Sequence, residues 1–395
     1  EEAAALSLYV HIPFCDARCA FCGCSSIATR NGEIKTRYVD SCLREIEHLA
    51  QATGESCRLA GIHFGGGTPS SVGAEALGRI VSAASSRMGM AEGAELAIEI
   101  DPRAIEPEDI IQLCRIGFNR MSFGVQDFDA CVGKAIGRSC DFERIRRLID
   151  EAKEAGAGVN LDLIYGLPRQ TAKSWRETLA KVALLSPDRV ALFNFAYLPR
   201  RLPHQREIDA AALPGPLEKI SLFASAIEAF GEAGYSFIGL DHFAREGDQL
   251  AVAHRAGKLT RNFQGYTAAA GVPIVGVGAT SISEAGNLYA QNEKKLALYL
   301  QRIGRNEFAT SRGALLAPEE EGVRERIRSL FCSQRAAGVP EDVRMRLEPL
   351  ERDGLVFIDG DRVSLTPLGR LFPRQAAAAF DSGFDPFKSG YSRGV

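Results

Sequence analysis

The chain has 395 residues, of which 46% are hydrophobic and 25% are charged, as in a folded globular protein with a sizeable core. This composition excludes disordered, collagen-like and low-complexity proteins, and no apolar run reaches the roughly 18 residues that a membrane span needs. The 47 basic and 50 acidic residues give a net charge of −3, so we expect neither nucleic acid nor a membrane among its partners.

Short apolar segments alternate with segments of helical spacing over the first 200 residues, which is typical of repeated βα units and a parallel sheet. The six expected strands are Leu6–Ile12, Leu59–Phe64, Glu95–Ile100, Arg120–Gly124, Val159–Ile164 and Val190–Phe193. The helices expected between them include Tyr38–Ala52, Ala74–Met88, Pro107–Gly117, Phe142–Ala155 and Ser174–Leu185. Six such units form an open, partial barrel, whose ligand site lies at the carboxyl ends of the strands.

The pattern changes twice further along the chain and predicts three parts. Residues 1–200 are expected to form the barrel core and residues 201–309 a segment that closes the barrel or covers the substrate. Within this second part, Tyr235–Ala244 and Val275–Ile282 are expected to close or cover the barrel mouth. Residues 310–395 are expected to form a mostly helical domain.

The third part resembles a winged helix. Helices are expected at Pro318–Phe331 and Pro340–Arg352, followed by two short strands around the Asp359 and Gly360 turn and by a final helix. We interpret it as a packing lid rather than a DNA reader, because the acidic cluster Glu319–Glu321 would repel phosphates.

Four of the ten cysteines lie within ten residues, directly after the first expected strand. Cys15, Cys19 and Cys22 have the spacing C-x3-C-x2-C, and Cys24 follows them. Three thiolates on one loop can hold three corners of a [4Fe–4S] cluster and leave one iron open for the amine and carboxylate of S-adenosyl-L-methionine. A zinc knuckle or chance clustering is the alternative, but no second Cys or His pair lies at zinc-finger distance.

The six other cysteines are scattered and do not form a disulfide framework, so we expect reduced thiols and a cytoplasmic location. The sequence begins at Glu1 rather than Met, so we expect its natural start to have been processed, trimmed or left out.

The cysteine loop resembles that of the radical S-adenosylmethionine enzymes, whose core is commonly a partial six-stranded barrel. Further segments resemble the oxygen-independent coproporphyrinogen III oxidase group: Tyr9–Cys15, Phe64–Pro69, Glu99–Pro102, Phe123–Phe128 and Asp162–Pro168. Asp241–Ala244 and Arg261–Thr267 resemble the dehydrogenases of that group rather than their haem-chaperone relatives. The resemblance implies an α/β fold, a partial (β/α)6 TIM-like barrel with a mostly helical, winged-helix-like C-terminal domain.

By this resemblance the protein is an enzyme that converts the ring A and B propionates of coproporphyrinogen III to vinyl groups and yields protoporphyrinogen IX. A [4Fe–4S] cluster and S-adenosyl-L-methionine would supply a 5′-deoxyadenosyl radical. The implied partners are the tetrapyrrole substrate, an electron donor and an unidentified electron acceptor, and we expect a monomer. The family commonly has a longer segment before the first strand, and we expect such an arm to be absent from this sequence.

Two alternatives stay open. The chain could be a haem-binding or haem-transfer protein of the same superfamily, although Cys24 and the segment Arg261–Thr267 argue against it. It could also be a radical enzyme that acts on another tetrapyrrole, which would keep the cluster and cofactor motifs but change the substrate pocket.

Several candidate site residues lie at the ends of expected strands. The run Gly65–Gly67 lets backbone approach a ligand closely, and the carboxylate of Glu99 ends an apolar strand, where it needs a partner. Polar residues at strand ends also commonly cap the next helix. The resemblance implies that Cys15, Cys19 and Cys22 bind the cluster. It assigns Tyr9, Gly66, Glu99 and Ile282 to one S-adenosyl-L-methionine and assigns Phe21, Gly67, Thr68, Gln126, Arg138, Asp162, Ile164 and Ala196 to a second.

Other residues have two interpretations each. Cys24 is either a catalytic residue or a spectator thiol, and His242 is either a substrate-facing acid or base or a satisfied histidine. Four arginines are candidates to meet substrate carboxylates, or are ordinary surface residues: Arg200, Arg201, Arg245 and Arg261.

Overall fold

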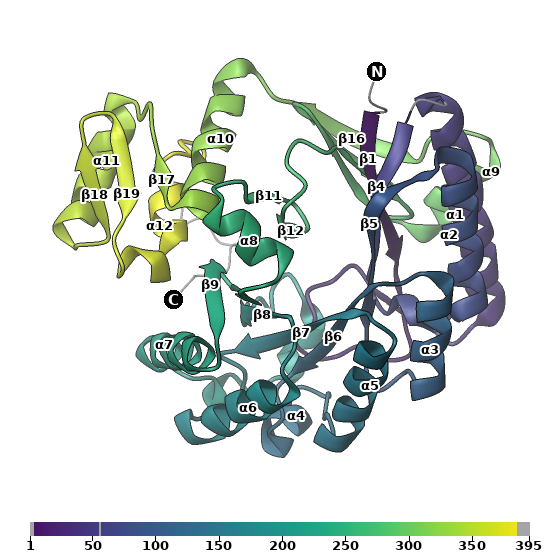
Figure 1. The fold of residues 1–395 in the computed structure, drawn as a ribbon, viewed down its shortest axis with the longest axis horizontal. Coiled ribbons are helices and arrows are strands. Elements are labelled where there is room, and N and C mark those ends of the chain that lie inside the picture. The colour runs from purple at the N-terminus through teal and green to yellow at the C-terminus, as the bar shows by residue number, and fades with distance from the viewer. Residues whose placement is uncertain (1–3, 55–56, 385–395) are drawn as a thin grey trace.

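Six parallel strands form the core of the protein in the computed structural model, which describes residues 4–54 and 57–384 (Figure 1). They are β1 (Ala4–Ile12), β4 (Cys57–Gly66), β5 (Met90–Ile100), β6 (Arg120–Gln126), β7 (Gly158–Tyr165) and β8 (Arg189–Asn194). Each strand pairs with the next in chain order, and the sheet curves into a partial barrel. All six strands expected from the sequence are confirmed.

Helices follow the strands and cover the outer face of the sheet (Figure 1). They are α1 (Gly32–Thr53), α2 (Ala74–Met88), α3 (Pro107–Ile116), α4 (Ala130–Ala135), α5 (Phe142–Glu154) and α6 (Ala172–Leu185). In α5 the residues Ile145, Leu148, Ile149 and Ala152 are buried, a spacing that places one apolar stripe against the sheet. Asp141 caps this helix by accepting a hydrogen bond from the backbone N–H of Arg144. The long helices after the strands were all predicted, whereas the short α4 was not.

Additional strands extend the sheet at both edges. Beside β1, the sheet continues through β13 (Ile274–Val277), β14 (Ile282–Ala285), β15 (Leu288–Asn292) and β16 (Thr310–Leu315). Beside β8, it continues through β10 (His242–Arg245) and β9 (Tyr235–Gly239). The two segments expected to close or cover the barrel mouth therefore contribute strands to the same sheet.

Smaller elements complete this part of the chain. Three more helices are α7 (Pro216–Glu232), α8 (Gln249–Arg255) and α9 (Leu296–Gly304). The short strands β2 (Phe14–Cys15) and β3 (Ile27–Ala28) pair with each other, and β11 (Thr260–Asn262) pairs with β12 (Gly265–Thr267). Single 3-10 turns lie at Pro69–Val72, Pro203–Glu207, Ala210–Ala212 and Gly369–Leu371.

The C-terminal elements pack around a hydrophobic cluster of their own, which includes Leu330, Leu347 and Val363. The helices are α10 (Pro318–Ser333), α11 (Glu341–Arg352) and α12 (Pro373–Ala378), and the sheet has the order β17 (Arg335–Ala336), β19 (Arg362–Leu365), β18 (Val356–Asp359). The helices and the two strands around the predicted turn are confirmed, while the two-residue β17 was not predicted. The winged-helix comparison and the division at residues 200 and 309 stay predictions, and β16 belongs to the large sheet. Within the described ranges no helix is long and apolar enough to cross a membrane.

Candidate active site

The cysteine loop leaves β1 at its carboxyl end, as the sequence predicted. Pairing of β2 with β3 closes the loop, and a hydrogen bond from the backbone N–H of Ala20 to the carbonyl of Ile136 attaches it to the segment after α4. Cys19 is buried, Cys15 and Cys22 are half-buried, and none of them forms a disulfide. The three thiols therefore sit on one short loop at the rim of the barrel.

Donor groups surround the sulfur atoms of this loop. Arg103 Nη2 lies 3.3 Å from Cys19 Sγ, Arg138 Nη1 lies 3.8 Å from the same sulfur, and Thr68 Oγ1 lies 3.5 Å from Cys15 Sγ. Cations and hydroxyl donors stabilise thiolates, which are the form of cysteine that binds iron–sulfur clusters. In the described part of the chain no three His, Cys, Asp or Glu side chains are grouped as ligands of a metal ion. The fit of a [4Fe–4S] cluster therefore rests on the three thiols and on the donors around them.

Asp101 holds the two arginines beside Cys19. Arg103 donates from Nε and Nη2 to the Asp101 carboxylate at 3.0 and 2.7 Å, and Arg138 Nη2 lies 3.3 Å from it. Burial alone would raise the pKa of Asp101, but the two guanidinium groups lower it below its ordinary value. Sequence reasoning missed Arg103 and Asp101, although they lie only four and two positions after Glu99 in the chain.

Glu99 ends β5 beside the glycine-rich end of β4. Its carboxylate accepts a hydrogen bond from the backbone N–H of Gly66 at 3.2 Å and lies 3.3 Å from His63 Nε2. Burial would raise the pKa of Glu99, but His63 and the Gly66 N–H lower it below its ordinary value. Gly66 has a φ of 116°, and a Cβ there would approach His11 within 2.6 Å, so this position requires glycine. An ionised carboxylate at a close-packed backbone suits a cationic or hydroxylated ligand such as S-adenosyl-L-methionine.

A second set of predicted residues meets around Gly124 on β6. A Cβ on Gly124 would lie 2.8 Å from Arg138 Nη2 and 2.9 Å from Gln126 Nε2, so both polar groups crowd this glycine. Arg138 also donates to the Gly124 carbonyl at 2.6 Å. Gln126 is buried and has a φ of 69°, which is unusual for a residue with a side chain. The structure therefore brings Gln126 and Arg138 together, as predicted.

Asp162 lies on β7, facing the interior of the barrel. Its carboxylate accepts hydrogen bonds from Ser122 Oγ at 3.0 Å and from Asn160 Nδ2 at 2.8 Å. Burial, followed by the negative charge of Glu99, raises the pKa of Asp162 to about 6. This carboxyl group therefore changes its charge close to neutral pH.

Gln205 joins two of the less distinctive candidates. Its Nε2 donates to the carbonyls of Phe21 at 3.2 Å and Ala196 at 3.0 Å. Phe21 also packs against the hydrophobic cluster that contains Ile164. These three predicted residues are therefore neighbours, whereas Ile282 lies on β14, separated from β1 by β13.

Cys24 is exposed at the end of the cysteine loop. Its backbone N–H points at Cys22 Sγ over 3.4 Å. The hydrogen bond between the two side chains lowers the pKa of the Cys22 thiol, and the same interaction together with burial raises the pKa of Cys24. A catalytic role of Cys24 stays a prediction.

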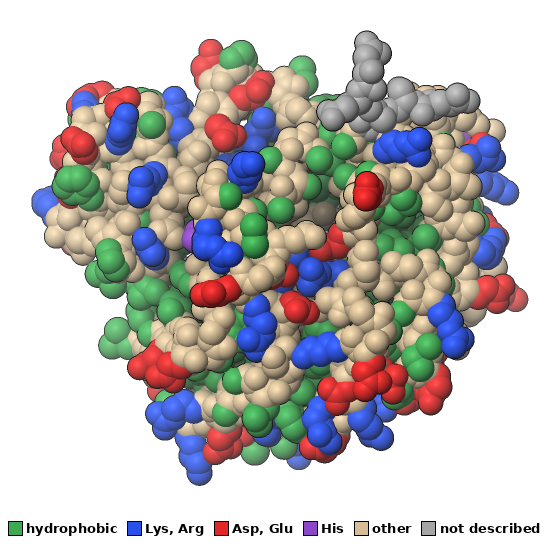
Figure 2. Space-filling view, in the orientation of Figure 1, with side chains coloured by type: hydrophobic (Ala, Val, Ile, Leu, Met, Phe, Trp, Pro, Cys, Tyr) green, Lys and Arg blue, Asp and Glu red, His purple; other side chains and the backbone are tan. Residues whose placement is uncertain are grey.

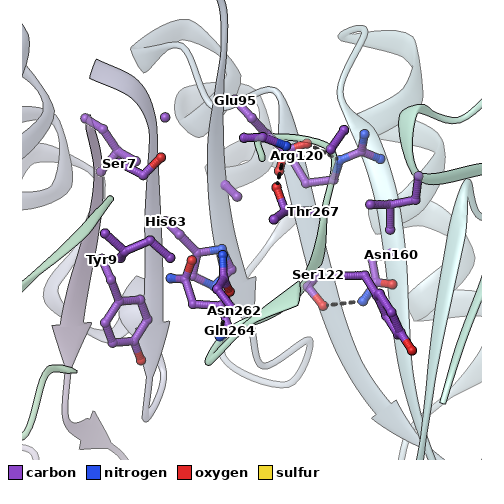
Figure 3. A pocket seen from close by; sticks show the side chains of 18 of the residues that line it. Ser7, Tyr9, His63, Glu95, Arg120, Ser122, Asn160, Asn262, Gln264 and Thr267 are labelled. Carbon is purple, nitrogen blue, oxygen red and sulfur yellow. Dashed lines mark hydrogen bonds and ion pairs between the residues drawn. The ribbon is translucent and has the colours of Figure 1, made fainter. Parts of the chain in front are cut away.

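A cavity of about 630 Å³ fills the barrel interior next to these residues. Figure 2 shows the molecule hollowed near the middle of this face. Tyr9, Glu99 and Asp162 line the part nearest the cysteine loop, and Figure 3 shows that side chains from the β11–β12 hairpin also point into the cavity. Its wall includes the aromatic side chains of Phe193 and Phe263. The cavity thus combines apolar and aromatic surface with many polar and charged groups.

Three members of an ionic quartet, Glu95, Arg120 and Arg189, line the cavity on the amino-terminal side of Glu99 and of the facing strand ends. Arg120 lies 3.2 Å from Glu95 and 3.5 Å from Asp248, and Arg189 lies 2.9 Å from Asp248 and 3.6 Å from Glu95. Figure 3 shows Arg120 beside Glu95. The quartet links the middle of β5 to the first residues of β6 and β8 and to Asp248, the residue before α8.

The arginines that line the cavity are not the four that the sequence analysis gave as candidates to meet substrate carboxylates. Arg120 and Arg189 are the Lys or Arg residues among its described lining, which does not include Arg200, Arg201, Arg245 or Arg261. Arg245 instead donates to Ser186 and lies over the ring of Tyr235. Arg120 begins a predicted strand and Arg189 directly precedes one, so alternation along those strands could have indicated the face on which each lies, although not that the two meet.

Known proteins are similar to this chain along most of its length. The radical SAM superfamily model matches residues 9–182. The oxygen-independent coproporphyrinogen III oxidase of Escherichia coli (strain K12) is 41% identical to this chain, and the match covers 95% of this chain and 85% of that protein. The protein of the same name from Bradyrhizobium diazoefficiens is 40% identical, with 99% of this chain and 90% of that protein covered.

A solved structure agrees with these sequence matches. Coproporphyrinogen III oxidase from Escherichia coli, described as a radical SAM enzyme, superimposes with a TM-score of 0.92 at 40% identity, covering 97% of this chain and 91% of that one. With the cysteine loop, the partial barrel and its cavity in place, this chain belongs to the oxygen-independent coproporphyrinogen III oxidase family of the radical SAM superfamily.

Proposed function

We propose that this enzyme oxidatively decarboxylates the ring A and B propionates of coproporphyrinogen III without oxygen, giving the vinyl groups of protoporphyrinogen IX in haem biosynthesis. Curated relatives at about 40% identity carry the name of this activity. The structural observation that carries the proposal is that Tyr9 and Glu99 line a cavity of about 630 Å³, and that Tyr9 lies on β1, the strand that leads into the cysteine loop. An unactivated C–H bond near the cofactor end of this cavity would be within reach of the radical chemistry.

The enzyme uses a [4Fe–4S] cluster and S-adenosyl-L-methionine. When bound and reduced, they supply a 5′-deoxyadenosyl radical that can remove a hydrogen atom from the β-carbon of a propionate. Cys15, Cys19 and Cys22 are our candidates to hold the cluster, with Arg103 and Arg138 supplying positive charge at Cys19.

We infer that the chain also binds and orients the cofactor. The ionised carboxylate of Glu99 and the backbone at Gly66 would hold one S-adenosyl-L-methionine beside Tyr9, with Ile282 at its margin. A second molecule would lie near Gly124, where Gln126 and Arg138 meet. The remaining candidates for this second site are Phe21, Gly67, Thr68, Asp162, Ile164 and Ala196.

The barrel interior has two further tasks. It must hold the tetrapyrrole with a propionate near the cofactor end, and it must keep water away from a reactive radical. The rings of Phe193 and Phe263 in the cavity wall, and the hairpin β11–β12 beside them, support this assignment.

We further infer a one-electron donor that reduces the cluster and an acceptor for the electron released with carbon dioxide, because the overall decarboxylation is an oxidation. We expect the enzyme to act in the cytoplasm, since none of its ten cysteines forms a disulfide. We also expect it to be a monomer.

The test is an anaerobic assay of the reconstituted enzyme. The protein is loaded with iron and sulfide and supplied with reductant, S-adenosyl-L-methionine, coproporphyrinogen III and cell extract, and 5′-deoxyadenosine and protoporphyrinogen IX are measured by mass spectrometry. We expect both products, and we expect neither from Cys19→Ala.

Other outcomes would replace the proposal. If 5′-deoxyadenosine forms without protoporphyrinogen IX, the enzyme acts on another substrate. If neither product forms and the protein binds haem, the haem-carrier alternative holds instead.

A further inference from the structure

His242 and Asp241 form a dyad at the edge of the cavity. Asp241 belongs to the tight turn between β9 and β10, in which Leu240 has a φ of 49°, and His242 is the first residue of β10. His242 lines the cavity and its side chain is 16% exposed, whereas the Asp241 side chain is 10% exposed. The turn thus places a buried carboxylate directly behind an imidazole that faces the cavity.

The carboxylate determines which ring nitrogen carries the proton. His242 Nδ1 lies 2.6 Å from Asp241 Oδ1, and Arg374 on α12 lies 3.5 Å from the other carboxylate oxygen. Burial would raise the pKa of Asp241, but His242, Arg374 and Arg261 lower it below its ordinary value, so the group is an anion. An anion at this distance accepts the Nδ1–H, so the neutral form of the imidazole carries its lone pair on Nε2.

Aromatic neighbours hold the imidazole ring in this orientation. The ring of Tyr266 meets it edge to face with centroids 5.3 Å apart, and Phe193 does so at 6.4 Å. Tyr266 is itself fixed, because its hydroxyl donates to the carbonyl of Phe331 at 2.9 Å. Within residues 4–54 and 57–384, no hydrogen bond reaches His242 Nε2. By contrast, His242 Nδ1 and both carboxylate oxygens of Asp241 have partners. The ring therefore presents a rigid and unused acceptor at the cavity.

We propose that His242 Nε2 accepts a hydrogen bond from a pyrrole N–H of the tetrapyrrole, and that Asp241 is the positioning residue that fixes the required tautomer. The inference rests on the proposed function. A porphyrinogen offers two kinds of polar group, ionised carboxylates that only accept hydrogen bonds and pyrrole N–H groups that donate them. A lone pair therefore selects the pyrrole N–H and repels the carboxylates.

This role separates two parts of substrate recognition. The pyrrole core would be held at β10 and the hairpin β11–β12, while the propionates extend from it toward the rest of the cavity. Because Arg374 and Phe331 come from α12 and α10, the C-terminal elements support the dyad without touching the cavity.

Equilibrium binding of coproporphyrinogen III to the reconstituted enzyme tests the proposal, under anaerobic conditions and with S-adenosyl-L-methionine present. His242→Asn keeps a donor for Asp241 but is too short to place an acceptor where Nε2 lies. We expect its Kd to rise about tenfold, the loss of one hydrogen bond. His242→Gln places an amide oxygen near the Nε2 position, so we expect it to recover most of that affinity.

Asp241→Asn tests the tautomer. Its amide no longer selects the proton on Nδ1, so we expect the Kd for coproporphyrinogen III to rise by a factor of about three to ten. His48→Asn, on the outer helix α1, is the matched control, and we expect the wild-type Kd. Iron content and bound S-adenosyl-L-methionine, measured in every variant, show whether the fold and the cofactor site are intact.

The outcomes distinguish this inference from the proposed function. A wild-type enzyme that neither binds nor converts coproporphyrinogen III overturns both. A wild-type enzyme that forms protoporphyrinogen IX, together with an unchanged Kd in His242→Asn, overturns the dyad's role alone. Equal losses in His242→Asn and His242→Gln would show that the ring is needed for packing rather than as an acceptor, and this result also overturns the proposal.

Discussion

Arg103 places its Nη2 atom 3.3 Å from the sulfur of Cys19, and Asp101 holds the guanidinium in that position through two further hydrogen bonds. The arginine thus brings a fixed positive charge to one expected cluster ligand. Hydrogen bonds to ligand sulfurs and nearby charges are general determinants of iron–sulfur reduction potentials.

We expect Arg103→Ala to lower the reduction potential of the cluster, because the reduced cluster carries more negative charge and loses more from removal of the cation. A tenfold change in the reduction equilibrium corresponds to about 59 mV for one electron, and we expect a shift of this order. Redox titration followed by electron paramagnetic resonance measures it. Arg115→Ala, an exposed site on α3, is the control, and an unshifted potential in Arg103→Ala would refute the role of this contact.

Cys19→Ala should prevent assembly of a stable cluster, since it removes a buried thiol from a loop with three expected ligands. We expect iron content and 5′-deoxyadenosine formation to fall to background after anaerobic reconstitution. Cys131→Ala, at an exposed cysteine on α4, should retain both. Full iron loading of Cys19→Ala would remove Cys19 from the ligand set.

Asp162 should make stability depend on pH in an unusual direction. Its pKa in the folded protein is about 6, above the ordinary value of 3.8, so between these values the folded state binds more protons than the unfolded state. Its contribution to stability therefore falls as the pH rises from about 4 to above 6.

The amide introduced by Asp162→Asn does not titrate, so the variant should not lose this stability as the pH rises. We expect the free energy of unfolding of Asp162→Asn, taken relative to wild type, to be about 1 kcal/mol higher at pH 7 than at pH 5. Thermal unfolding at the two pH values, without added S-adenosyl-L-methionine, measures the gain. A difference between variant and wild type that does not change with pH would contradict the raised pKa.

Glu45, on α1, is not a candidate site residue, but we expect it to be important for the stability of the fold. It is 2% exposed and accepts hydrogen bonds from the Gly278 N–H, from Asn292 Nδ2 and from Tyr299 Oη at 2.6 to 2.7 Å. Glu45→Ala leaves these three buried donors without their partner, and we expect a loss of about 3 kcal/mol or more.

Chemical or thermal unfolding measures this loss against a control on the same helix. Glu47 forms an exposed ion pair with Arg87, and we expect Glu47→Ala to cost less than about 1 kcal/mol. Equal stability of the two variants would show that the Glu45 network contributes little.

Local patterns predicted much of this protein. The six strands, their helices and the cysteine loop depend on periodicity and on residues close in the chain, and the structure has them where the sequence placed them. The short β17 was missed, because two residues carry no periodicity.

Residues whose role depends on the barrel were harder to predict. Arg245 lies three positions after His242 on β10, so the two side chains face opposite sides of the sheet, and only His242 reaches the cavity. Arg120 and Arg189 meet across β6, β7 and β8 through Asp248, a residue of a different segment. Such a meeting follows from tertiary closure and has no local signal.

The position of β1 in the sheet has a consequence for synthesis of the protein. β1 leads into the cysteine loop and pairs with β4 on one side and with β13 on the other, where Ser7 is opposite Ile274. The hydrogen bond between Glu45 and Gly278 likewise joins residues 233 positions apart in the chain. On the ribosome, β1 and the cysteine loop emerge long before the strand that covers the open edge of β1. Unpaired edges invite aggregation and distant contacts form slowly. A chain that stops before Ile274 therefore exposes the bare edge of β1, and the sheet is protected on this side only once β13 has been synthesised.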